Sequence, residues 1–134
     1  MKKLILLLPI ALLFFGCPNN DDKIILEEEE ETLTNVTYKV LLFRFIPDTG
    51  HNSSRLQYEI EFNNPNNVSV KGFFKITTNI DGQISVVFAN KKTARCYQIG
   101  ANSSCTISFN EEVSFDLGKI ASIEFVSAEY LFEK

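Results

Sequence analysis

The side chains most capable of chemistry in this chain are three cysteines, Cys17, Cys96 and Cys105, and one histidine, His51. A Ser-His-Asp site needs a histidine held by a carboxylate, and a zinc site needs several Cys or His residues at ligand spacing. Thiol catalysis usually shows a Cys-x-x-Cys pair, and a phosphate site shows a Gly-rich loop. The sequence has none of these arrangements, so we expect no enzymatic activity, no bound metal and no cofactor.

The segment before Cys17 has the layout of an export signal. A basic start at residues 1–3 leads into an apolar run of 12 residues, 4–15, broken only by Pro9 and followed by Gly16. A membrane-spanning helix needs ~20 apolar residues, so this run is too short to span a bilayer. A positive start, a short apolar middle and a small residue before the cleavage point are typical of a signal peptide.

The residues Leu13-Phe14-Phe15-Gly16-Cys17 resemble the lipobox of bacterial lipoproteins. In that family a peptidase cleaves directly before the cysteine, which then carries the lipid anchor. The resemblance implies removal of residues 1–16 and acylation of Cys17. Several acyl chains hold a protein at a membrane far more firmly than one chain does. An ordinary secretory signal with an unmodified cysteine is the alternative.

The details of this segment resemble lipoproteins of the Bacteroidota. Phe14 and Phe15 occupy the places where the commonest lipobox has Leu followed by Ala or Ser. Asp21 and Asp22 follow the cysteine, and acidic residues at this place resemble the surface-export signals of that group. The implied location is the bacterial outer membrane, where the lipid-anchored protein faces either the periplasm or the cell surface.

Net charge divides the rest of the chain into two parts. Residues 17–33 hold seven acids, five of them consecutive at 27–31, and one base, whereas residues 34–134 hold ten of each. A run of like charges repels itself and stays hydrated, so residues 17–33 are predicted to be an extended acidic tether. Residues 34–134 are long enough for one domain. Neither part has the basic surface of a nucleic-acid-binding protein, and the membrane, reached through the anchor, is the expected partner.

If Cys17 carries lipid, Cys96 and Cys105 remain as a pair. An exported protein meets an oxidising compartment, so we predict a structural disulfide between them. The two cysteines are close in sequence with no Trp between them, unlike the immunoglobulin arrangement. The disulfide is therefore expected to staple one hairpin or loop and not to join two sheets.

Apolar residues recur at period two through the domain, and no long helical pattern competes with them. In residues 54–62, Leu, Tyr, Ile and Phe alternate with Arg, Gln and Glu. Asp81-Gly82 predicts a tight hairpin. The other predicted strands are 36–43, apolar on both faces and hence expected to be central, 68–78, with a bulge at Gly72, and then 84–88, 105–109, 113–117 and 123–132. About seven strands predict an antiparallel β-sandwich of immunoglobulin-like size, with a small up-and-down β-barrel as the alternative.

The expected binding site is the polar loop between the two paired cysteines, because loops carry function and a closed loop is already ordered. Tyr97, Gln98 and Asn102 are predicted to contact a partner, either an envelope protein or a glycan. Residues 91–95 are basic and are predicted to form a solvated loop, with an anion site as the alternative. The leading function is a membrane-anchored, non-enzymatic binding or scaffolding module. The alternative is a lipocalin-like carrier that encloses a lipid or a small apolar ligand.

Overall fold

The computed structural model of the chain describes residues 32–134. The predicted signal peptide (1–16), the proposed lipid attachment at Cys17 and nearly all of the acidic tether (17–33) lie outside the described residues. Within them, the elements in chain order are β1 (Thr37–Ile46), β2 (Ser53–Asn64), β3 (Val70–Ile80), β4 (Gln83–Phe88), β5 (Gln98–Ile99), β6 (Ser103–Ser114), the 3-10 helix η1 (Phe115–Leu117) and β7 (Ile123–Phe132). No helix in this part of the chain is long and apolar enough to cross a membrane.

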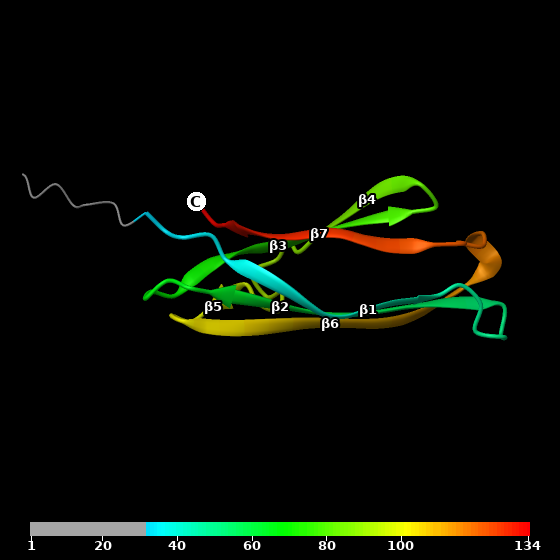
Figure 1. Cartoon of the computed structure of the whole chain (residues 1–134), viewed down its shortest axis with the longest axis horizontal. Coiled ribbons are helices and arrows are strands. Elements are labelled where there is room, and N and C mark those ends of the chain that lie inside the picture. The colour runs from blue at the N-terminus through cyan, green and yellow to red at the C-terminus, as the bar shows by residue number, and fades with distance from the viewer. Residues whose placement is uncertain (1–31) are drawn as a thin grey trace, which may run out of the picture. The chain divides into compact units, whose positions relative to one another are not determined.

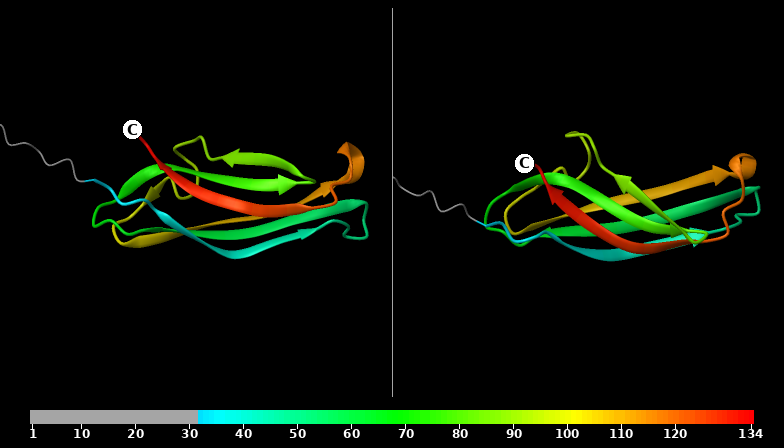
Figure 2. Two further views of the ribbon diagram at one scale, coloured as in Figure 1. Left: turned by 45° about the horizontal axis from the view of Figure 1, so that its top comes forward. Right: turned by 90° about the horizontal axis from the view of Figure 1, so that it is seen from above.

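The strands form two antiparallel sheets, which are the two layers seen in Figure 1. One sheet has the order β1-β2-β6; in the other, β3 pairs with β4, β7 and the two-residue β5. Figure 2 shows the start of β1 and the end of β7 at one end of the sandwich, opposite the β1–β2 and β3–β4 turns. Because no ladder within residues 32–134 joins the two sheets, the predicted β-sandwich is confirmed and the up-and-down barrel alternative is wrong.

The core lies between the layers and consists of inward-facing residues at period two. Ile60 and Phe62 on β2 are fully buried, as the alternation of residues 54–62 predicts. The Phe62 ring centroid lies 6.1 Å from that of Phe74 on β3 and 6.0 Å from that of Tyr130 on β7. Aromatic contacts across the layers therefore hold the two sheets together.

The position of β1 differs from the prediction. Apolar residues at 41–43 predict a central strand, but β1 is an edge strand of the three-stranded sheet, and Leu41 and Leu42 are exposed. The register between β1 and β2 shifts between Val40 and Leu42. Such a bulge interrupts the strict alternation of side chains, so a run of apolar residues does not require cover on both faces.

The prediction of separate strands at 105–109 and 113–117 is also wrong. β6 is one strand of 12 residues, and η1 follows it directly. Its partner β2 also has 12 residues and pairs with it along the whole length. Pairing with β2, together with an ion pair of 3.5 Å between Arg55 and Glu112, keeps the polar residues 110–112 within the strand.

Gly72 allows close approach of two strands and does not form the predicted bulge. It pairs regularly with Phe132, and the register shift between β3 and β7 lies at Thr77 and Thr78. A Cβ atom at position 72 would lie 2.2 Å from the carbonyl oxygen of Leu131. Only glycine fits this contact without movement of the backbone.

The predicted hairpin at Asp81-Gly82 is confirmed. Both residues have positive φ, 49° and 88°, as a type I′ turn requires. The Asp81 carboxylate accepts hydrogen bonds from the backbone N–H groups of Ala121 (3.1 Å) and Ser122 (2.7 Å), which lower the pKa of Asp81. The hairpin is thereby tied to the connection between β6 and β7.

Candidate functional site

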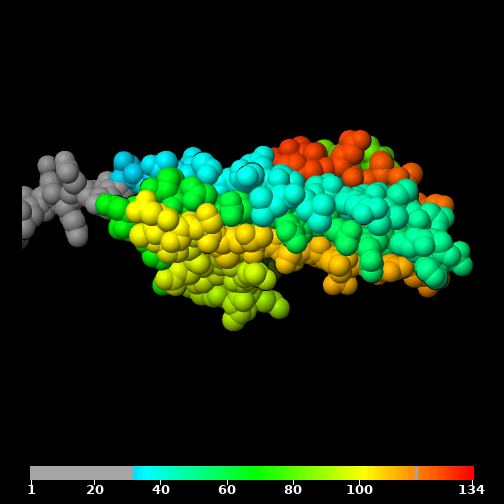
Figure 3. Space-filling view, turned by 60° about the horizontal axis from the view of Figure 1, so that its bottom comes forward, coloured from blue at the N-terminus to red at the C-terminus, as the bar shows by residue number. Residues whose placement is uncertain are grey.

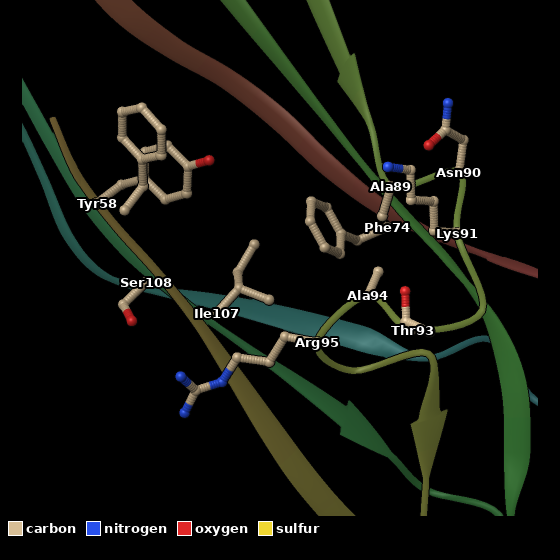
Figure 4. A pocket seen from close by; sticks show the side chains of 11 residues that line it. Tyr58, Phe74, Ala89, Asn90, Lys91, Thr93, Ala94, Arg95, Ile107 and Ser108 are labelled. Atoms are coloured by element: carbon tan, nitrogen blue, oxygen red, sulfur yellow. The ribbon is translucent and has the colours of Figure 1, made fainter.

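An open pocket of about 300 Å³ lies between the two sheets, on the side where β4 and β6 do not pair. Tyr58 on β2 and Phe109 on β6 line it from one sheet, Phe74 on β3 lines it from the other, and residues of the loop after β4 border it. Figure 4 shows Tyr58, Phe74 and Ile107 around the opening, and Figure 3 shows this loop as a lobe that projects beside β6. The volume is at the lower end of the range of ligand sites, ~300–1,000 Å³.

The floor of the pocket belongs to a row of stacked aromatic rings. The registers of the two ladders place Phe43, Tyr58 and Phe109 side by side across β1, β2 and β6. The ring centroids are 6.3 Å apart for Phe43 and Tyr58 and 5.0 Å apart for Tyr58 and Phe109, with interplanar angles of 12° and 8°. Aromatic pairs contribute about 0.5–1.5 kcal/mol each beyond their buried area. The Tyr58 ring lies between the other two, so Phe109, exposed on the edge strand β6, presents the outer ring of this ordered apolar row.

The Tyr58 hydroxyl is the polar group of this floor. Burial raises the pKa of Tyr58 above its ordinary value, so the hydroxyl keeps its proton at neutral pH. Within residues 32–134, the tyrosine hydroxyls that form hydrogen bonds are those of Tyr97 and Tyr130, and not that of Tyr58. The Tyr58 hydroxyl is therefore available to donate to a ligand.

The rim of the pocket carries positive charge. Lys91 and Arg95 border it, and its lining includes no Asp or Glu from the described chain. The salt bridges formed within residues 32–134 use other basic side chains, among them Lys92, whose Nζ lies 2.6 Å from Glu133 Oε1. The site thus combines an aromatic floor with two cations that no carboxylate of the domain neutralises. Residues 91, 92, 93 and 95 are exposed in this loop, in line with the predicted solvated loop, and the anion-site alternative stays a prediction.

The predicted Cys96–Cys105 disulfide is confirmed, with a Cα–Cα distance of 5.6 Å. Cys105 belongs to β6 of the three-stranded sheet, whereas Cys96 lies just ahead of β5, which pairs with β3 of the other sheet. The cross-link therefore joins segments of two sheets. The prediction of a staple on one hairpin or loop holds for the loop, because the disulfide closes residues 96–105, but not for a hairpin, because β5 and β6 are consecutive in the chain and belong to different layers.

Two further contacts hold the chain next to Cys96. The Tyr130 hydroxyl lies 3.0 Å from the Cys96 carbonyl oxygen and 2.8 Å from that of Tyr97, and can donate to either. Burial raises the pKa of Tyr130 to about 12, so this donor keeps its proton. The Gly72 N–H donates to the Tyr97 carbonyl oxygen at 2.9 Å. The loop that borders the pocket is thus anchored to both β3 and β7 at its C-terminal end.

Tyr97, a predicted partner contact, lies beside the disulfide and does not line the pocket. It is half-buried, and its ring centroid lies 5.4 Å from that of Phe73. Its hydroxyl donates to Glu133, and this hydrogen bond raises the pKa of Tyr97. A Tyr97→Ala change would therefore remove packing as well as any contact with a partner.

The other predicted contacts, Gln98 and Asn102, are exposed. Gln98 Nε2 donates to Ser69 Oγ at 3.1 Å, and the Asn102 N–H donates to the Asn66 carbonyl oxygen at 2.8 Å. Asn66 also accepts a hydrogen bond from the N–H of Thr34, near the start of the described chain. Asn102 therefore lies at that end of the sandwich. The role of these residues in binding stays a prediction.

The aromatic residues of the pocket are missed by sequence analysis because their pattern is that of ordinary core residues. Tyr58 and Phe109 both have the inward parity of their strands, which predicts burial. They remain partly open because β4 has six residues and cannot cover the 12 residues of β6. The predicted strands 84–88, 105–109 and 113–117 are equally long, so their lengths contain no signal of this opening.

Among residues 32–134, no group of three or more His, Cys, Asp or Glu side chains could hold a metal ion. Comparison with protein-family models, with curated protein sequences and with solved structures finds no match to this chain. The pocket and the N-terminal sequence are therefore the features from which a function can be argued.

Proposed function

We propose that this protein is a lipid-anchored, non-enzymatic lipoprotein of the bacterial envelope, and that its β-sandwich binds an anionic glycan in the pocket between the sheets. The observation that carries the proposal is the combination of the stacked floor of Tyr58 and Phe109 with the unneutralised cations Lys91 and Arg95. An aromatic face packs against the apolar face of a sugar ring, and a guanidinium or ammonium group pairs with a carboxylate, sulfate or phosphate.

The shape of the pocket supports a binding module over a carrier. A carrier needs a cavity that encloses most of its apolar ligand. Here the sheets are not closed on one another, and the pocket opens beside the loop after β4. The lipobox-like Leu13-Phe14-Phe15-Gly16-Cys17 supports the anchor and the envelope location.

The test of the pocket is a direct measurement of binding by calorimetry, with matched acidic and neutral oligosaccharides. We expect the acidic ligands to bind and the affinity to fall with added salt, because paired charges are screened. Lys91→Ala and Arg95→Ala should each lower affinity by about tenfold, which is ~1.4 kcal/mol. Lys92→Ala is the matched control, since Lys92 belongs to the same loop but pairs with Glu133.

Three outcomes would count against the proposal. Equal binding of neutral and acidic sugars would remove the role of the two cations. Equal loss of affinity in the Lys92 variant would show a general charge effect. Co-purification of a lipid, detected by native mass spectrometry, would favour the carrier. The anchor is tested separately, by labelling with a radioactive fatty acid that should be incorporated by the wild type and not by Cys17→Ser.

A further inference from the structure

The strand β4 pairs with β3 along one edge, leaves its other edge free, and is apolar on its outer face. Its six residues, Gln83–Phe88, contain no charge, no proline and no glycine. Ile84, Val86 and Phe88 on the outer face of the sheet are 65%, 41% and 53% exposed, and Val87 on the inner face is 50% exposed. Short uncharged segments with this β-propensity pair readily with another strand when their edge is free.

The other edge strands of more than two residues are protected by charge, and β4 is not. β1 carries Lys39 and Arg44 and has a register shift, β6 carries Glu111 and Glu112, and β7 carries glutamates at 124 and 129. Charges and bulges on an edge are the usual devices against pairing with a second chain. Their absence from β4 alone marks this edge as one that accepts a strand.

The free backbone groups of β4 belong to its outward-facing residues. Ala89 N–H donates to the Phe74 carbonyl oxygen of β3, so the odd-numbered residues of the strand bond to β3. The N–H and C=O groups of Ile84, Val86 and Phe88 consequently point away from β3. A strand that pairs here would meet three apolar residues at successive hydrogen-bonded positions.

We propose that this strand is β4 of a second copy of the chain, paired antiparallel about a two-fold axis that passes through Val86. In this register Val86 lies opposite Val86 of the second copy, and Ile84 lies opposite Phe88. Each of these cross-strand pairs is apolar, which favours pairing.

The second copy is the occupant that these observations favour. A two-fold axis makes the same strand serve both chains, so one set of apolar side chains satisfies both sides of the contact and closes the assembly at two. The outcome is a continuous six-stranded sheet with the order β7-β3-β4-β4-β3-β7. An extended segment of a different protein or a bilayer surface would use the same apolar face without this symmetry.

The register is tested by cysteine cross-linking of the full chain in intact cells, with a short thiol-reactive cross-linker. Val86→Cys should give a covalent dimer, because the two Cα atoms of a directly opposed pair are about 5.5 Å apart. Ile84→Cys should give none, because its two copies are offset by four residues, or about 14 Å. Glu124→Cys, on the free edge of β7, is the control for random collision. A dimer with Ile84→Cys or Glu124→Cys, or none with Val86→Cys, would overturn the proposal.

A charge exchange tests the same contact without a cross-link. Val86→Lys and Val86→Asp should each reduce the mass measured by sedimentation from that of two chains to that of one, because like charges then face each other. An equimolar mixture of the two variants should restore the mass of two chains. Because Val86 is exposed, both variants should keep the circular dichroism spectrum of the wild type. Dimers of either variant alone, or a wild-type monomer, would contradict the proposed interface.

Discussion

Replacement of Asn64 by alanine should lower the free energy of unfolding of this domain more than the replacement of any exposed polar residue. Asn64 is completely buried at the end of β2. Its Nδ2 donates to the carbonyl oxygens of Val68 and Gly100, both at 2.8 Å. Its Oδ1 accepts from the backbone N–H of Asn66 at 3.0 Å and from Asn66 Nδ2 at 2.7 Å. One side chain thus connects the β2–β3 loop with the β5–β6 turn.

The cost of Asn64→Ala follows from these four hydrogen bonds. At about 1 kcal/mol for each bond, the free energy of unfolding should fall by about 4 kcal/mol, because the partners are left buried and unsatisfied. In a domain of this size that loss lowers the melting temperature by about 15–30 °C. Urea unfolding, followed by circular dichroism, measures the change. Asn67→Ala, in the same loop but exposed, should change stability by less than about 0.5 kcal/mol.

A nearly isosteric change tests the direction of the bonds. Asn64→Asp keeps an oxygen for Asn66 but places a second oxygen against the carbonyl groups of Val68 and Gly100, so its folded-state pKa should rise. A raised pKa means that stability is present at low pH and is lost as pH increases through the folded-state value. Relative to wild type, Asn64→Asp should therefore be least stable at neutral pH and partly recover near pH ~4. Equal urea midpoints for the Asn64→Ala and Asn67→Ala variants would refute the reasoning.

Three further changes test the rest of the fold. Replacing both Cys96 and Cys105 by serine should lower the free energy of unfolding by about 2.6 kcal/mol in the chain-entropy model for a separation of nine residues, measured by urea unfolding. Gly72→Ala should cost about 1–3 kcal/mol in the same assay, because its Cβ meets a backbone oxygen, whereas Gly100→Ala should be tolerated. Asp81 has a lowered folded-state pKa, so its contribution is present above its unfolded value and is lost as pH falls through the folded value. The stability of Asp81→Asn should fall less steeply with acid than that of wild type.

Local patterns account for the parts of the fold that sequence analysis predicts correctly. Period-two alternation identifies the strands and the buried face of β2, and Asp81-Gly82 identifies the hairpin because positive φ is required at both residues. The cysteine pair predicts the disulfide from the count and the expected compartment alone. Each of these inferences needs only residues that are close in the chain or a property of the whole composition.

The errors concern the arrangement of strands relative to one another, which no local pattern contains. The apolar residues 41–43 indicate burial on two faces, but strand order decides whether β1 is central or at an edge. The polar residues 110–112 resemble a turn until β2 is available to pair with them. The connection of β5 and β6 across the layers likewise turns a local disulfide into a contact between sheets.

The pocket depends on local sequence patterns and also on the arrangement of distant segments, and the disulfide connects the two. Its aromatic floor follows from strand parity, whereas its cationic rim depends on where the loop after β4 returns to the sandwich. Cys96 has a φ of 62°, a conformation that is unfavourable for residues other than glycine. The disulfide and the Tyr130 hydroxyl hold it there, so the loop leaves in a fixed direction and keeps Lys91 and Arg95 near Tyr58. A free loop would have to lose its conformational entropy on binding, which lowers affinity. The cysteines can therefore shape the site although neither lines it.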